Sequence, residues 1–178
     1  MKLISTGFLH ENKDEAVAWR GPLKHRLIEN FLTDVRWREL DCLIIDTPPG
    51  TGDEIISIVQ ISDRIDGAII VSTPQDIALA DVRRTIKFCK DYSIPVIGII
   101  ENMSGFICPH CGKEVEVFKA GGAERFTESY KIPFLGKIHL DPSITTTSDD
   151  GKPIILSYPD SEPAKAFSKI IDKIIEFL

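Results

Sequence analysis

The sequence predicts a doubly wound α/β domain built on a mostly parallel sheet. Three short apolar runs, at residues 43–45, 67–71 and 95–100, lack the alternating polar residues of a sheet with one solvated face. Segments with helical spacing of apolar residues separate these runs, so strands and helices alternate along the chain. Right-handed crossovers between parallel strands then place the helices on both faces of the sheet.

The composition is that of a folded domain. At 178 residues the chain can bury a sizeable core, and we expect a single domain over 1–178. Charged residues are 27% of the chain and the net charge is −6, which argues against a disordered chain and against nucleic acid as the main partner. No secretory signal is recognisable, and no apolar run approaches the roughly 20 residues of a membrane span. We therefore expect a cytoplasmic protein.

The amino-terminal third is predicted to hold two strands and two helices. Residues 2–9 have strand character, and a helix with an apolar stripe spans 23–32. The first buried strand follows that helix. Either Thr51 or Asp53 can cap the next helix, which runs to about residue 61.

The rest of the chain is predicted to continue this alternation. A helix over 76–92 separates the second and third buried strands. A helix over 122–130, a strand over 132–138 and a loop over 139–142 come next. The last helix carries balanced charges on its polar face, which favours packing on the sheet over contact with a membrane. Its expected buried side consists of Phe167, Ile170, Ile171, Ile174, Ile175 and Leu178.

An acidic residue follows the first buried strand directly. Asp46 lies at the expected carboxyl end of that strand, the edge at which open α/β sheets bind ligands. The next four residues, Thr-Pro-Pro-Gly, force a turn that leaves backbone groups free. This pattern is typical of a Walker B acid and its switch loop, where the carboxylate holds the Mg²⁺ of a nucleotide, usually through water. Taken alone, an Asp at a strand end is more often a helix or turn cap.

Two further polar residues are candidates for ligand contacts. Asn102 follows the third buried strand, and its side chain offers the donor and the acceptor that recognition of a purine edge requires. Asn102 is therefore a candidate adenine contact, with a turn-closing role as the competing interpretation. Arg20 could contact a phosphate or a partner, and a solvated stack on Trp19 is the interpretation that we favour.

The four cysteines differ in their spacing and surroundings. Cys42 lies in a predicted strand and Cys89 on the apolar face of a predicted helix, so both are expected to be core residues. Cys108 and Cys111 form a C-P-H-C pair, followed by glycine, within a predicted loop insertion over 103–119. A loop of this kind presents two thiolates to one metal ion at a fixed distance.

Three interpretations of the C-P-H-C pair compete. A thioredoxin-type redox pair would be followed by a helix, but residues 113–118 alternate like a short strand. A zinc knuckle would need a second pair of ligands, and the sequence offers none at a suitable spacing. A symmetric dimer supplies four thiolates when each chain brings two cysteines to the two-fold axis. A cluster that bridges two subunits is therefore the economical interpretation, and His110 could serve as an extra ligand.

Zn²⁺ can occupy the same four thiolates as an iron–sulfur cluster. The competing function is therefore a non-catalytic dimeric module that holds structural zinc at the cysteine pair.

Four stretches together resemble the Mrp-type iron–sulfur cluster carrier ATPases, a branch of the deviant P-loop family that includes cell-division and chromosome-partition ATPases. They are GFLHENKDEAVAWRGP at 7–22, DTPPGTGDE at 46–54, STPQDIALADVRR at 72–84 and IIENMSGFICPHCG at 99–112. The resemblance implies a P-loop NTPase-like homodimer that binds ATP with Mg²⁺, carries a 4Fe–4S cluster at Cys108 and Cys111, and passes it to apo iron–sulfur proteins. It also implies that Asp46 is the catalytic Walker B acid, that Asn102 contacts adenine, and that Asp53 is a switch II candidate.

The sequence departs from that family in one respect. Family members carry a glycine-rich loop with two lysines, whose backbone N–H groups cradle the phosphates. The only Gly-Gly here, at 121–122, has no lysine after it. We expect the chain to correspond to the carboxyl-terminal part of the fold, without the Walker A half. Three consequences are then open: another chain supplies this half, the protein self-associates, or the isolated portion is poorly stable. ATP hydrolysis by this chain alone is not expected.

Overall fold

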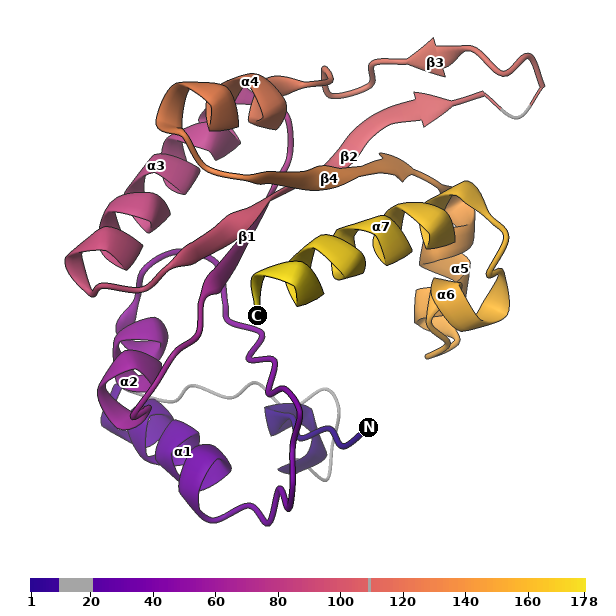
Figure 1. Ribbon diagram of the computed structural model, residues 1–178. Helices are drawn as coiled ribbons and strands as arrows, with labels where there is room; N and C mark the ends of the chain where they lie inside the picture. Colours follow the sequence, from indigo (N-terminus) through magenta and orange to yellow (C-terminus); the bar gives the residue numbers. More distant parts are fainter. Residues whose placement is uncertain (10–20, 109) are drawn as a thin grey trace. The chain divides into compact units, whose positions relative to one another are not determined.

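The computed structural model describes residues 1–9, 21–108 and 110–178 (Figure 1). Arg20 lies outside the described residues. Two compact units are present, Met1–Ile65 and Asp66–Leu178. The prediction of a single domain stays a prediction. The helices of the first unit are η1 (Thr6–Leu9), α1 (Gly21–Thr33) and α2 (Asp53–Ile61).

The first unit is built on the packing of α1 against α2. Lys24 on α1 donates a hydrogen bond to Glu54 on α2 at 2.5 Å, and Nδ1 of His25 lies 2.9 Å from Oγ of Ser57. The hydrogen bond from Lys24 is the main cause that lowers the pKa of Glu54, so this carboxylate is held in its charged form. Of the apolar residues of α2, Ile58 is the buried one. The two helices predicted for this part of the chain are therefore present.

Neither strand predicted for the first unit forms. Residues 2–9 contain the single turn of η1, and residues 43–45 belong to no helix or strand and have no strand partner among the described residues. Ile44 is 85% exposed, and Cys42 is exposed as well, so the prediction of a core cysteine there is wrong. Backbone N–H and C=O groups become part of a buried strand only when a neighbouring strand bonds them. The described part of this unit offers no such neighbour.

The second unit contains a four-stranded sheet with β2 as its central strand (Figure 1). Its strands are β1 (Ala68–Ser72), β2 (Val96–Ile107), β3 (Glu114–Val115) and β4 (Phe134–Leu140). β2 pairs in parallel with β1 and with β4, and its far end pairs antiparallel with β3. The helices are α3 (Asp76–Asp91), α4 (Gly122–Tyr130), α5 (Pro142–Asp149), α6 (Ile154–Ser157) and α7 (Glu162–Phe177). The predicted α/β class with a parallel sheet is confirmed.

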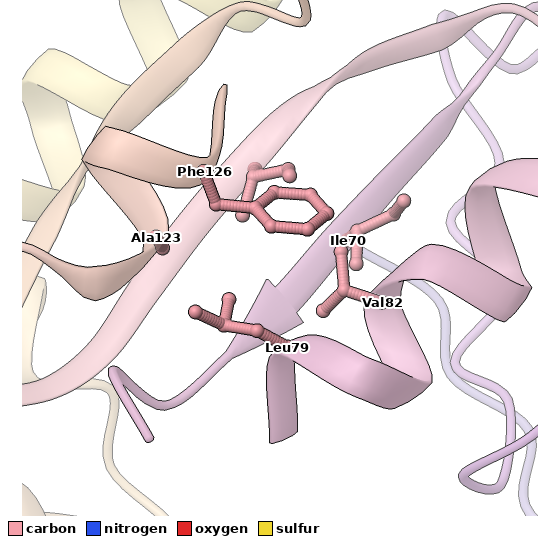
Figure 2. Close-up of a cluster of buried hydrophobic side chains, with 6 residues drawn as sticks. Ile70, Leu79, Val82, Ala123 and Phe126 are labelled. Carbon is pink, nitrogen blue, oxygen red and sulfur yellow. The ribbon is translucent and has the colours of Figure 1, made fainter. Parts of the chain in front are cut away.

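Helices cover both faces of this sheet. Figure 2 shows the cluster on one face, where α3 packs on β1 and α4 packs on β2. Its buried residues are Ile70, Leu79, Val82, Ile99, Ala123 and Phe126. A second cluster, beneath α7, contains Ile97, Leu135, Ile138 and Ile170. Phe134 and Leu135 are neighbours in β4 but belong to different clusters, as expected for a strand whose successive side chains point to opposite faces.

β2 runs further than the sequence predicts. The sequence predicts a strand over 95–100 that ends before Asn102, yet β2 continues to Ile107, so the predicted loop insertion begins as strand. Met103 and Gly105 have positive φ angles of 56° and 72°, and the register of β2 against β4 shifts across this segment. An irregular strand of this kind lacks the regular side-chain alternation by which a continuation could be recognised. β4 likewise includes His139, which was predicted to lie in a loop.

Only part of the predicted apolar side of α7 is buried. The helix contacts β4 and β2, and one stripe of a helix can face a sheet. Ile170 lies within the core, with Phe167 and Ile174 packed beside it. The prediction is wrong for the residues that remain exposed, Ile171, Ile175 and Leu178. Among the helices that the structure describes, none is long and apolar enough to cross a membrane.

A glycine allows α4 to approach the segment between β1 and α3. A Cβ atom at Gly122 would lie 2.1 Å from the carbonyl oxygen of Pro74, which is fully buried. We predict that Gly122→Ala lowers the free energy of unfolding by about 3 kcal/mol, because a clash with backbone cannot be relieved by turning a side chain. Urea denaturation measures the change. Glu124→Ala, at an exposed position of the same helix, should stay within about 0.5 kcal/mol of the wild type.

Candidate metal centre

The cysteine pair lies in the turn that joins β2 to β3. The N–H of Cys108 donates to the carbonyl of Lys113 at 2.9 Å, and the N–H of Gly112 donates to the carbonyl of Cys108 at 2.8 Å. Gly112 has a φ angle of 68°, a left-handed conformation that glycine adopts without strain. We call residues 106–115 the cysteine hairpin. In Figure 1 this hairpin extends beyond the end of β4.

The turn favours the thiolate form of Cys108. The pKa of the Cys108 thiol is lowered, first by the backbone N–H of His110, then by the backbone N–H and the thiol of Cys111. Cys108 is half-buried and Cys111 is exposed, so both sulfur atoms can be reached from solvent. Thiolates, not thiols, bind soft metal ions. The turn therefore favours the thiolate of Cys108, which with Cys111 forms the predicted metal-binding pair.

One copy of the hairpin brings together only these two ligands. In the described ranges, no group of three or more His, Cys, Asp or Glu side chains is arranged to hold a metal ion. His110 is exposed. Cys89 is buried in α3, where burial raises the pKa of its thiol, so it is the core residue that the sequence predicted. Tetrahedral thiolate centres need four ligands, so the hairpin offers half of such a site.

A buried carboxylate lies at the base of this region. Glu101 of β2 has no exposed surface, and it accepts hydrogen bonds from the N–H of Gly121 at 2.9 Å and the N–H of Ala123 at 2.7 Å. The hydroxyl of Ser104 donates to it as well. Glu101 thus caps the amino terminus of α4, where a negative charge is favourable. It joins the two ends of the segment that contains the cysteine hairpin.

The role of Glu101 was not inferred from the sequence. A carboxylate within an apolar strand indicates a buried charge whose hydrogen bonds are complete, because burial of an unpaired charge is unfavourable. The partner of that charge, the start of α4, lies 20 residues further along the chain. Sequence spacing alone does not predict that contact.

Asn102 is held with one hydrogen-bonding group free. Its Oδ1 accepts a hydrogen bond from the N–H of Met103 at 2.9 Å, which fixes the side chain beside the left-handed Met103. In the described part of the chain, no group accepts a hydrogen bond from its amide nitrogen. The half-buried side chain thus keeps a donor and a second lone pair of the oxygen. This fits a contact to a purine, and it also fits the turn-closing role.

Asp46 and Asp53 belong to the first unit. Asp46 is exposed in the extended segment that follows residues 43–45. Asp53 is the first residue of α2, whose amino-terminal cap is Gly52 without a side-chain hydrogen bond, so neither Thr51 nor Asp53 caps this helix. Both carboxylates are open to solvent and could accept a hydrated Mg²⁺ ion. Their role at a nucleotide, together with Asn102 of the second unit, stays a prediction.

The sequence of this chain is similar to a family model and to several known proteins. A family model described as ParA, NUBPL iron-transfer P-loop NTPase, matches residues 1–175. The rat cytosolic Fe-S cluster assembly factor NUBP2 is 47% identical over 177 residues, which are 98% of this chain and 65% of the rat protein. The NUBP2 homolog of Nematostella vectensis is 49% identical over 174 residues, 97% of this chain and 64% of that protein. The chain thus spans slightly less than two thirds of these relatives.

Solved structures share the fold. A nucleotide-binding protein of Archaeoglobus fulgidus, in complex with ADP and with cobalt found in it, is 41% identical, with a TM-score of 0.66 over 73% of this chain and 53% of that chain. The cell-division ATPase MinD of Pyrococcus furiosus is 23% identical, with a TM-score of 0.66 over 92% of this chain and 64% of that one. The likeness to MinD shows the fold.

We predict that Cys108 of the metal-free protein reacts with iodoacetamide at lower pH than an ordinary thiol. Two backbone N–H groups favour its thiolate in the folded chain, so the midpoint of its pH–rate profile should lie below that of N-acetylcysteine. Mass spectrometry of the alkylated peptide gives the rate. In urea, which removes the turn, the midpoint should return to that of the model thiol. A folded-state midpoint at or above that value would contradict the predicted direction.

We also predict that Glu101→Gln lowers the free energy of unfolding by about 2 kcal/mol, because it removes charge-assisted hydrogen bonds to the start of α4. Chemical denaturation followed by circular dichroism measures this. Glu128→Gln, an exposed position of α4, is the matched control and should change the free energy by less than about 0.5 kcal/mol. Equal stabilities of the two variants would mean that Glu101 does not act as the cap of α4.

Proposed function

This chain belongs to the ParA family of NUBPL-type iron-transfer P-loop NTPases, and from that premise we propose that it acts in iron–sulfur cluster assembly as a cluster carrier. The names of its relatives as Fe-S cluster assembly factors support this function. The cluster is the cargo, and apo iron–sulfur proteins are its recipients. The relatives are named cytosolic, which supports the same compartment for this chain.

The observation that carries the proposal is the chemistry of the cysteine hairpin. Cys108 is held as a favoured thiolate by backbone N–H groups, and the exposed Cys111 lies three residues further along the same turn. No basic side chain is among the causes that lower the pKa of Cys108. Iron–sulfur clusters are held by thiolates, and hydrogen bonds to sulfur tune them. A cluster bound in an exposed turn can be passed to a recipient more readily than one in a core.

The cluster is of the 4Fe–4S type and bridges a homodimer. Such a cluster takes four cysteine ligands, and each hairpin supplies two, so a two-fold axis at the hairpin completes the set. A symmetric dimer is also the commonest assembly of soluble proteins. His110, exposed between the two cysteines, is available as a further ligand when the cluster leaves.

Nucleotide binding is the second part of the proposal. Asp46 and Asp53 would face the hydrated Mg²⁺ of ATP, with Asp46 in the catalytic role, and Asn102 would contact the adenine. The family description as P-loop NTPases and the ADP bound to the Archaeoglobus relative support this. Asn102 lies in β2 and Cys108 directly follows the end of that strand, so β2 would link the nucleotide to the cluster.

The apolar surface left open in each unit supports a further partner. Ile44 is 85% exposed in the first unit, and Val71 of β1 is 60% exposed in the second. Strands of parallel sheets are normally buried on both faces, and an open strand edge favours pairing with another chain. We propose that a chain with a P-loop half, or a second copy, covers this surface.

The alternative function is a non-catalytic dimeric module with structural zinc at the cysteine hairpin. The donor set favours it equally well, because Zn²⁺ binds four thiolates in tetrahedral geometry. The two functions differ in the metal that the freshly purified protein contains.

Cys108→Ser and Cys111→Ser should each abolish iron binding after anaerobic reconstitution, because a missing thiolate leaves the cluster without a ligand in each subunit. The wild type should bind about four iron atoms per dimer and turn brown. Iron and sulfide analysis with absorption spectroscopy measures this. Cys42→Ser, a change at an exposed cysteine of the first unit, is the control and should keep the iron.

Unchanged iron content in the Cys108 and Cys111 variants would refute the cluster site. Zinc in the freshly purified protein, a dimer that falls apart with chelator, and no reconstitution with iron would favour the structural zinc module instead.

A further inference from the structure

Two side chains reach toward each other from opposite sides of the central strand. Phe106 of β2 pairs with Val115 of β3 and also with Leu140 of β4, so β3 and β4 flank β2 on its two edges. Glu114 of β3 and His139 of β4 nevertheless approach each other, with Oε1 of Glu114 3.8 Å from Nδ1 of His139. Their contact therefore crosses β2.

A glycine in β2 makes this crossing possible. A Cβ atom at Gly105 would lie 2.8 Å from Oε1 of Glu114 and 3.4 Å from its Cγ. The glutamate side chain thus lies over the bare backbone of Gly105, where any other residue would displace it. Gly105 also has a φ angle of 72°, which favours glycine. Gly105, in the irregular part of β2, therefore leaves open the space that the side chain of Glu114 occupies.

His139 has an unsatisfied polar atom that points to the same pairing. Its Nδ1 is inaccessible to solvent and has no hydrogen-bond partner among the described residues. A buried imidazole nitrogen without a partner is unfavourable. The carboxylate of Glu114 is 45% exposed at its side chain and can move, so a shift of about 1 Å would bring it to hydrogen-bonding distance of Nδ1.

The hairpin needs such a connection. β3 has only two residues, and both are exposed, so its pairing with β2 is too short to be stable alone. Glu114 follows Lys113, whose carbonyl accepts the hydrogen bond from the N–H of Cys108. A contact that fixes Glu114 therefore also limits where the two cysteines lie.

We propose that Glu114 and His139 form a clasp across Gly105 that holds the cysteine hairpin against β4, and that both are positioning residues for the bound metal. The inference that the clasp positions a metal rests on the proposed function, whereas the clasp itself does not. When the clasp is closed, the hairpin keeps one orientation and holds its metal. When it is broken, the hairpin moves as a flexible arm and releases the metal faster.

The first test uses the metal-free chain over residues 1–178 and amide hydrogen exchange by NMR. Glu114→Ala and His139→Leu should each speed exchange of the Cys108 and Gly112 amides by about tenfold, and the double variant should add little, because the two residues act through one contact. The amide of Ile99, which donates to the carbonyl of Pro133 at 3.0 Å, reports on the sheet and should not change. Glu116→Ala, exposed on the same segment, is the matched control and should behave as the wild type.

A conservative variant separates a clasp from general packing. Glu114→Gln keeps an oxygen acceptor of the same reach, so it should retain most of the protection that Glu114→Ala loses. If His139→Leu does not fold, the two Glu114 variants, changed at a partly exposed side chain, still decide the matter. The proposal is overturned if the hairpin amides exchange at wild-type rates in Glu114→Ala, or if Ile99 accelerates as much as they do.

The second test uses Co²⁺ as the metal probe. The thiolate charge-transfer absorption of the Co²⁺ protein should be present in the wild type and in Glu114→Ala, but transfer of Co²⁺ to a chelator should be about tenfold faster in the variant. Equal transfer rates would overturn the positioning role. Absence of thiolate-bound Co²⁺ in the wild type would instead refute the metal function of the hairpin, while the exchange experiment would still test the clasp.

Discussion

The carboxylate of Glu101 accepts hydrogen bonds from the backbone at the start of α4 and from Ser104, and no part of the residue is exposed. These contacts join the residue of β2 at which the segment with the cysteine hairpin begins to the start of α4, at which that segment ends. A buried charge is tolerated only when its hydrogen bonds are complete, and here a helix amino terminus supplies them. The cysteine hairpin can therefore extend into solvent while both of its ends stay anchored in the core that α3, α4 and the sheet form.

Three kinds of contact act on the cysteine hairpin. Glu101 holds its base, Glu114 approaches His139 along its length, and the N–H groups around Cys108 prepare the thiolate in its turn. None of these contacts requires a positive side chain next to the sulfur atoms. A soft metal ion bound there would itself balance the charge of the thiolates. Its exchange would not require breaking an ion pair between a thiolate and a basic side chain. This arrangement is consistent with the carrier function that we propose.

Within each unit, apolar side chains remain open to solvent at segments that were predicted to be buried. Ile44 in the first unit and Val71 in the second illustrate this. The physical reason is the same in both cases, since an apolar strand is covered only where other strands and helices pack on it. The core that does form, under α3, α4 and α7, lies around β2, the strand that pairs with β1, β3 and β4.

The sequence by itself determined the α/β class, the helices with strong apolar periodicity such as α3, and the placing of Cys108 and Cys111 in one turn, because these depend on local spacing and residue type. Only the tertiary structure decided that residues 43–45 have no strand partner among the described residues and that β2 continues past Asn102. It also decided that Glu101 meets the start of α4 and that His139 lies near Glu114. Strand pairing and buried polar contacts join residues far apart in the chain. Periodicity records which side chains tend to be buried, whereas the identity of the group that meets each of them depends on how the strands and helices are brought together.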